Sequence, residues 1–223
     1  MDSTVARAVV TGSSDPRPFR VSPDGKYVLH GANLPDASHR SLVRVSFDGG
    51  PAQVVAKMDS WTGFDCPSVP AVPCVSSEAR TGQLVFSTFD PLTGSGREIA
   101  SVDARDPESR QWDLSPDASR IVVSDIEEGH VTTLRLSDGQ QRTLATEKMI
   151  QGGASWASSS DALLVYGYGE HRVLLRMDLE GKTRTLLETD LEYLVDFTPS
   201  PDGRRLAYVN GNLNSNIWLL ENF

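Results

Sequence analysis

The stretch Ser200-Pro201-Asp202-Gly203-Arg204-Arg205-Leu206-Ala207-Tyr208 begins with four residues that suit a tight turn. Proline presets φ at the second place, aspartate accepts a backbone hydrogen bond, and glycine tolerates a positive φ at the end. An aromatic residue precedes this turn and apolar, β-favouring residues follow it, which is typical of a hairpin. The stretch therefore predicts two antiparallel strands joined by a turn.

The same unit recurs along the chain at nearly even spacing. It is complete at Ser22-Pro23-Asp24-Gly25, ends in alanine at Ser115-Pro116-Asp117-Ala118, and has weaker forms at residues 67–70 and 157–160. The first residues are 22, 67, 115, 157 and 200, so the successive steps are 45, 48, 42 and 43 residues. A period in the forties, with strands in every unit, is typical of propeller blades.

Aromatic and apolar side chains keep a common register around these turns. The residues three places before each turn are Phe19, Phe64, Trp112, Ala154 and Phe197. Four aromatic residues in one register favour a propeller over an unrelated β-sandwich with scattered core aromatics. If Ala118 keeps the positive φ of the glycine it replaces, we expect a cost of about 1 kcal/mol.

We expect residues 1–223 to form one all-β domain, a five-bladed β-propeller of four-stranded antiparallel blades around a central channel. The expected blades are residues 12–57, 58–102, 103–145, 146–187, and 188–223 together with 5–11. The last unit offers three candidate strands, and residues 5–11 resemble the outermost strand of the other units. The N-terminal strand would then complete the last blade and close the ring, leaving no open sheet edge. The alternative is a fragment of a larger propeller.

Composition disfavours several kinds of partner. The formal charge is −9, from 21 basic and 30 acidic residues, which would repel nucleic acid and anionic lipid. The chain has no apolar stretch of membrane-spanning length and no signal-peptide pattern at its start. We therefore expect no nucleic-acid partner, no direct membrane insertion, and a monomer.

The two cysteines leave two interpretations open. Cys66 and Cys74 flank the first turn of the second blade, on neighbouring strands but not clearly opposite one another. They form a disulfide if their α-carbons come within about 7 Å, or they are two small buried hydrophobic residues.

Motifs for metals and catalysis are missing from the sequence. It has no Cys-x-x-Cys and no Asp-x-Asp-x-Asp-Gly loop, and its histidines, His30, His39, His130 and His171, are scattered. A Gly-x-Ser-x-Gly nucleophile elbow is also absent. We expect no metal, no cofactor and no enzymatic activity. The histidines are expected to be exposed loop residues without acidic partners at fixed spacing.

In a propeller, the loops between the second and third strands of each blade reach one face. Here these loops are residues 31–40, 78–82, 125–130, 167–171 and 210–215, while short turns such as Asp138-Gly139 and Glu180-Gly181 reach the other face. Longer loops often carry binding residues, so the loop face is the expected binding face. Its acidic character favours a protein or peptide partner of basic character. The expected binding residues are Asn33, Asp36, His39, Glu78, Arg80, Glu127, His130, Glu170, His171, Asn212 and Asn214.

With its Ser-Pro-Asp-Gly turns, the strand Leu206-Ala207-Tyr208 and the ending Asn216-Ile217-Trp218-Leu219-Leu220-Glu221-Asn222-Phe223, the chain resembles TolB-type, WD-repeat-like β-propellers. More narrowly, it resembles the carboxy-terminal propellers of bacterial membrane-tethered serine/threonine kinases and winged-helix regulators. This resemblance implies a sensing or docking module of a signalling protein, and a periplasmic or other extracytoplasmic location if the parent is membrane-tethered, otherwise a cytoplasmic one. The alternatives are a propeller hydrolase or lyase with its site at the channel mouth, and a structural fragment.

Overall fold

The computed structural model describes residues 19–33, 40–58, 61–67, 69–70, 72–145, 152–168, 171–191, 193–211 and 215–221. The chain divides into two compact units, residues 1–103 and 104–223. The described residues are almost entirely β-strand and turn, with one 3-10 helix, η1 (Pro107–Ser109). Among them there is no helix long and apolar enough to cross a membrane.

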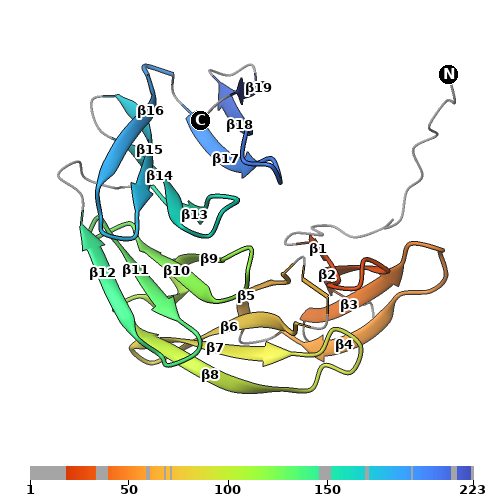
Figure 1. Ribbon diagram of the computed structural model, residues 1–223. Helices are drawn as coiled ribbons and strands as arrows, with labels where there is room; N and C mark the ends of the chain where they lie inside the picture. The colour runs from red at the N-terminus through yellow and green to blue at the C-terminus, as the bar shows by residue number, and fades with distance from the viewer. Residues whose placement is uncertain are drawn as a thin grey trace, which may run out of the picture. The chain divides into compact units, whose positions relative to one another are not determined.

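The first unit contains two four-stranded sheets, each a simple antiparallel meander (Figure 1). The first sheet consists of β1 (Phe19–Val21), β2 (Tyr27–Asn33), β3 (Arg40–Ser46) and β4 (Gln53–Lys57). The second sheet consists of β5 (Trp61–Asp65), β6 (Cys74–Arg80), β7 (Gln83–Phe89) and β8 (Gly96–Asp103).

The second unit contains three further antiparallel sheets. The third sheet consists of β9 (Gln111–Leu114), β10 (Arg120–Asp125), β11 (His130–Arg135) and β12 (Gln141–Ala145). The fourth consists of β13 (Ala154–Trp156), β14 (Ala162–Tyr168), β15 (Arg172–Asp178) and β16 (Thr183–Thr189). The fifth has three described strands, β17 (Tyr193–Pro199), β18 (Arg205–Gly211) and β19 (Ser215–Glu221).

The predicted all-β, antiparallel architecture is confirmed, and five sheets fit the five predicted blades. Residues 5–11, which were expected to add a fourth strand to the last blade, lie outside the described residues. Closure of the ring, and with it the single propeller domain, stays a prediction.

The repeated turn is held by a serine hydroxyl and an aspartate carboxylate. In the turns that start at Ser22, Ser115 and Ser200, the serine Oγ donates to the carboxylate two residues further on, each time at 2.6 Å. The same Oγ accepts the backbone N–H five residues further on at 2.9–3.0 Å. The aspartate Oδ1 accepts a second backbone N–H, two residues after itself, at 3.0–3.1 Å. These bonds fix the loop that joins the first two strands in the first, third and fifth sheets.

Positive φ angles occur where the sequence predicts them. Gly25 and Gly203 have φ of +70° and +67°, and Ala118 adopts φ +56° at the equivalent place. In the weaker turn at residues 157–160, Ser160 has φ +55° and no serine occupies the first place. Ala118 therefore meets the condition under which a cost of about 1 kcal/mol is expected.

Each sheet packs its alternating apolar residues against a neighbouring sheet within its unit, because successive strand residues point to opposite faces. Between the third and fourth sheets, Val122 and Val131 meet Leu163, Val165 and further buried residues. Polar links reinforce this contact, since Trp156 donates its backbone N–H to Asp113 Oδ2 at 2.8 Å and its Nε1–H to Asp113 O at 3.1 Å.

The core uses the predicted aromatic register in the second and fifth sheets. Phe64 and Phe197 are buried, at 2% and 9% exposure, as members of two core clusters. Phe197 also lies 5.3 Å from the Tyr166 ring, centroid to centroid. Phe19 is 60% exposed, so β1 does not bury its aromatic residue as β5 and β17 do.

A pair of reciprocal substitutions tests the turn conformation. Ala118→Gly should raise the free energy of unfolding by about 1 kcal/mol, because glycine adopts positive φ without the penalty of a Cβ. Gly25→Ala should lower it by a similar amount, since a Cβ built at Gly25 meets nothing within 4 Å and only the backbone conformation matters. Urea denaturation measures both. Stability changes of the same sign would contradict the turn assignment.

The turn aspartates should make stability pH-dependent. Burial raises the pKa of Asp117, but hydrogen bonds from Ser115 and Ser119 outweigh it and lower the pKa overall. An aspartate whose pKa is lower in the folded chain stabilises that chain at pH values above its unfolded pKa of about 3.9. This stabilisation is lost as the pH falls through the pKa of the folded chain. Asp117→Asn should therefore flatten the loss of stability below about pH 4. Asp106→Asn, at an exposed residue that makes no side-chain cap of η1, should leave the acid profile unchanged; equal profiles for both variants would refute the role of Asp117.

Candidate functional site

The hairpin ends of the third and fourth sheets are rigid turns built on carboxylates. Asp178 Oδ1 accepts the backbone N–H groups of Glu180 at 3.0 Å and Lys182 at 2.8 Å, between β15 and β16. Asp138 Oδ1 accepts the N–H of Gln140 at 3.0 Å, between β11 and β12. These bonds hold the strand ends, and the side chains beside them, in fixed positions.

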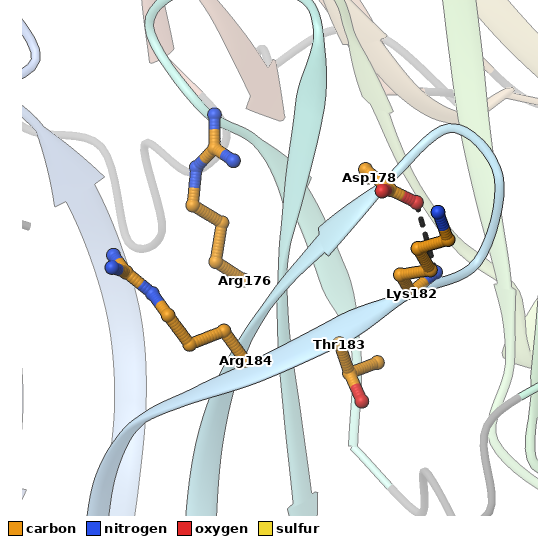
Figure 2. A pocket seen from close by; sticks show the side chains of 5 residues that line it. All are labelled: Arg176, Asp178, Lys182, Thr183 and Arg184. Carbon is orange, nitrogen blue, oxygen red and sulfur yellow. Dashed lines mark hydrogen bonds between the residues drawn. The ribbon is translucent and has the colours of Figure 1, made fainter.

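One hollow, here called the fourth-sheet hollow, lies at the end of the β15–β16 hairpin and has a volume of about 400 Å³. Figure 2 shows Arg176 on β15 and Arg184 on β16 extending side by side, with Asp178 and Lys182 at the turn. Thr183 points the other way from Arg184, as expected for successive strand residues. Three cations and one carboxylate therefore surround this space.

A second hollow, the third-sheet hollow, has a volume of about 380 Å³. It is more polar than apolar in character and combines residues of β10, β11 and β12 with the β15–β16 turn. Its lining residues are Arg120, Thr133, Arg135, Gln140, Gln141, Arg142, Leu179 and Glu180. The β15–β16 turn thus contributes Leu179 and Glu180 to this hollow and Lys182 to the other, so the two hollows flank the same hairpin.

Arginines stand directly opposite one another in both hollows. Arg120 pairs with Arg135 across β10 and β11, and Arg176 pairs with Arg184 across β15 and β16. Like charges at directly opposite positions destabilise a sheet. Arg135 Nη1 lies 3.1 Å from Asp138 Oδ2, and Arg176 makes an ion pair of the same length with Asp161. Each pair is therefore only partly neutralised by its own sheet.

Two arginines are more available than the others. Arg142 and Arg184 are exposed on the outermost strands β12 and β16. Within the described part of the chain, neither guanidinium has a hydrogen bond or ion pair to another side chain. We call the set Arg120, Arg135, Arg142, Arg176, Lys182 and Arg184 the cationic surface. It is a local concentration of positive charge on a chain of formal charge −9.

The cationic surface was not predicted from the sequence. Arg142 and Arg184 are 42 residues apart, the same step that separates the turns at 115 and 157, so they repeat at one strand position. That spacing was a usable signal. In contrast, the contributions of Arg120 and Arg135 depend on the pairing of strands and needed the structure.

Part of the predicted loop face lies outside the described residues, namely Asp36, His39, Glu170, Asn212 and Asn214. Within the second unit, Glu127 and His130 lie at the β10–β11 end of the third sheet, opposite the end that carries Asp138. Asn33 ends β2 and His171 precedes β15. The two ends of this sheet are therefore distinct, as expected. However, the two hollows lie beside the β11–β12 and β15–β16 turns, and not at the end that carries Glu127 and His130.

Two further expectations about loop residues are wrong. Glu78 and Arg80 lie in strand β6, because β6 and β7 are joined by a tight turn in place of a long loop. Arg80 also bonds Glu78 and Glu98, each at 2.9 Å, and these hydrogen bonds raise its pKa. This residue is engaged within its own sheet.

His39 lies outside the described residues, and each of the other three histidines differs in part from the prediction of exposed loop residues without acidic partners. His30 is buried in β2, where its Nδ1 lies 3.0 Å from Gly31 O. His171 Nδ1 lies 2.5 Å from Asp190 Oδ1, and His130 Nδ1 lies 3.7 Å from Glu128 Oε2. These two histidine–carboxylate pairs could not be predicted from a repeated spacing, because the partners are 19 residues apart in one pair and two residues apart in the other.

Asp125, Glu128 and His130 bring three ligand atoms within 4.8 Å of one another. However, the buried guanidinium of Arg110 forms an ion pair with the carboxylate of Asp125. Asp125 Oδ1 also accepts the N–H of Glu128 at 2.9 Å. The Asp125 carboxylate is therefore already paired with a guanidinium and with a backbone N–H group, and we assign no metal to these three residues.

Cys66 and Cys74 are joined by a disulfide, with their α-carbons 4.3 Å apart. The pairing of Asp65 with Val75 ends the β5–β6 ladder, so the next residue on each strand is a cysteine and the two face each other. The expectation that the cysteines are not clearly opposite is wrong. Of the two interpretations left open by the sequence, the structure has the disulfide.

Comparison with solved structures supports the fold. Family models match no part of the sequence, and no curated protein matches it. TolB from Acinetobacter baumannii superposes with a TM-score of 0.70 at 12% identity, over 92% of this chain and 51% of that one. The chain has a TolB-like β-propeller fold.

Other structures give the same fold with different functions. A putative TolB from Agrobacterium tumefaciens matches with a TM-score of 0.68 at 15% identity, over 91% of this chain and 76% of that one. An oligogalacturonate lyase in complex with manganese matches with a TM-score of 0.62 at 16% identity, over 87% and 58% of the two chains. This chain spans about half of the Acinetobacter protein. The likeness establishes the fold and leaves the function open.

The buried ion pair of Arg110 and Asp125 is expected to matter for stability. Both side chains are nearly inaccessible, at 3% and 11% exposure. Asp125→Asn should lower the free energy of unfolding by about 3 kcal/mol, because it leaves a buried guanidinium without its counter-charge. Asp138→Asn, at an exposed ion pair, should change it by less than about 1 kcal/mol. Chemical denaturation compares the two, and equal small losses would contradict the pairing at Arg110.

Proposed function

We propose that this chain is a non-catalytic protein-interaction module whose partner docks on the cationic surface of the third and fourth sheets. The observation that carries the proposal is the concentration of six cations around two neighbouring hollows on a chain of formal charge −9. The TolB-like propeller fold is in keeping with this proposal, because a rigid scaffold of this kind can carry binding residues on its exposed surface. The proposal replaces the loop face as the preferred docking surface.

The character of the hollows favours a macromolecular partner over a small enclosed ligand. Small-molecule sites are mostly apolar clefts that bury nearly all of the ligand. Here long charged side chains line the space, and Leu179 is the one apolar residue among the described lining residues. Charged groups at the edge of an interface mainly guide association and select the partner. The surface is therefore suited to a partner that covers both hollows at once.

We also propose that the module is the sensing or docking part of a bacterial signalling protein. The resemblance to propellers of membrane-tethered kinases and winged-helix regulators supports this role. The Cys66–Cys74 disulfide supports an extracytoplasmic location, because disulfides persist in oxidising compartments. A kinase or regulator domain encoded in frame with this chain would support the signalling role; a coding sequence without such a domain would refute it.

Site-specific cross-linking tests the docking surface. A photoreactive residue replaces Gln140, beside the third-sheet hollow, or Glu127, at the other end of the same sheet. In cells that express the chain, a discrete protein adduct should form from position 140 and not from position 127. Adducts from position 127 alone would restore the loop face and contradict the proposal. Turnover of oligogalacturonate by the purified chain would contradict the non-catalytic assignment.

A further inference from the structure

We infer that the cationic surface binds an extended, acidic peptide segment of its partner, with aspartate or glutamate at alternate positions. This inference rests on the proposed protein-interaction function and adds the chemistry of the partner. The main contacts are assigned to Arg142 and Arg184. Arg135 and Arg176 lie on the neighbouring strands β11 and β15, and each forms an ion pair with a carboxylate of its own sheet.

Arg142 and Arg184 form a regular pair of docking groups. They stand on the outermost strands of neighbouring sheets, opposite Thr133 and Arg176 respectively. A guanidinium binds a carboxylate through two parallel N–H···O bonds, with well-defined geometry. In an extended peptide, alternate side chains point to the same side. Acidic residues at alternate positions would therefore all point from one side of the segment toward the cationic surface.

The like-charge pairs give a physical reason for anion binding. Arg176 and Arg184 face each other across β15 and β16, and Asp161 neutralises only the first of them at 3.1 Å. A carboxylate placed between these guanidinium groups would remove their repulsion in addition to forming new bonds. The opposed arginines repel each other in the free chain and are neutralised when the acidic peptide is bound. The chain should therefore melt at a higher temperature with the peptide than without it.

The carboxylates within the surface discriminate between classes of anion. Asp178 and Glu180 interrupt the positive charge, and Asp178 is fixed there by the backbone bonds of its turn. Duplex DNA carries one charge about every 1.7 Å, and such dense charge would meet these carboxylates. A peptide can instead place polar residues and backbone N–H groups beside them. No aromatic residue is among the described residues that line either hollow, so nucleobases have no stacking platform here.

The test uses a fluorescent synthetic peptide of alternating glutamate and serine, and a matched peptide of alternating lysine and serine. Fluorescence anisotropy of the intact chain should detect binding of the first peptide and not of the second. Affinity should fall as salt rises, because screening weakens exposed ion pairs. Failure of the glutamate peptide to bind, or binding that is insensitive to salt, would overturn the inference.

Charge-matched variants locate the binding site. Arg142→Glu with Arg184→Glu should weaken binding by at least about tenfold, because two attractive contacts become repulsive. Arg97→Glu with Arg105→Glu makes the same change in net charge at exposed residues that line neither hollow, and should alter affinity by less than about twofold. Thermal melting of all variants without peptide checks that they are folded. Equal losses in the two double variants would show a non-specific charge effect and overturn the inference.

Two competitors separate this inference from other ligand classes and from the proposed function. If a galacturonate oligomer or a single-stranded oligonucleotide binds more tightly than the glutamate peptide, the assigned ligand is wrong. If cross-linking from position 140 captures a protein while the glutamate peptide does not bind, the docking function stands and only the acidic segment is refuted. If the peptide binds and no adduct forms, the surface chemistry stands and the cellular function fails.

Discussion

The hydrogen bond from a serine hydroxyl to the carboxylate two residues further on is the interaction on which the rest of the structure depends. It recurs at 2.6 Å in three of the sheets and orients both side chains to accept backbone N–H groups that would otherwise lack a partner. Each of these turns also sets the register of the two strands that it joins. A shift of one residue would exchange the buried and exposed faces of a strand, so this small network also determines which side chains form the core.

The cationic surface follows from the same register. Val122 of β10 and Val131 of β11 point into the core between the third and fourth sheets, and alternation places Arg120 and Arg135 at the strand ends beyond it. The hairpin carboxylates then fix the turns that border the two hollows. Because apolar packing supplies the stability, the strand ends can hold like charges opposite each other. The cationic surface is therefore formed by strands and short turns of the repeating units, and not by a long variable loop.

Much of the fold could be predicted from the sequence, because the turn signals are local. The spacing of Ser-Pro-Asp-Gly units predicted the number of sheets, and the alignment of Ala118 with Gly25 and Gly203 marked the place where a positive φ is found. The cationic surface could not be predicted in the same way. The opposition of Arg176 and Arg184, or of Cys66 and Cys74, depends on the pairing of strands and on a single-residue register. The loop face was favoured because loops often carry function, whereas Arg80 lies in a strand and is held by two carboxylates.

Residue-resolved amide hydrogen exchange tests the central claim most directly. The backbone N–H groups of Tyr27, Arg120 and Arg205 all donate to the turn serines, although each follows a tight turn at the surface. The account predicts that these three amides exchange as slowly as amides in the middle of the neighbouring strands, and that replacing the turn serine by alanine speeds exchange at the corresponding amide. Fast exchange of all three in the unaltered chain would contradict the claim that the serine–aspartate network holds the turns and, through them, the sheets.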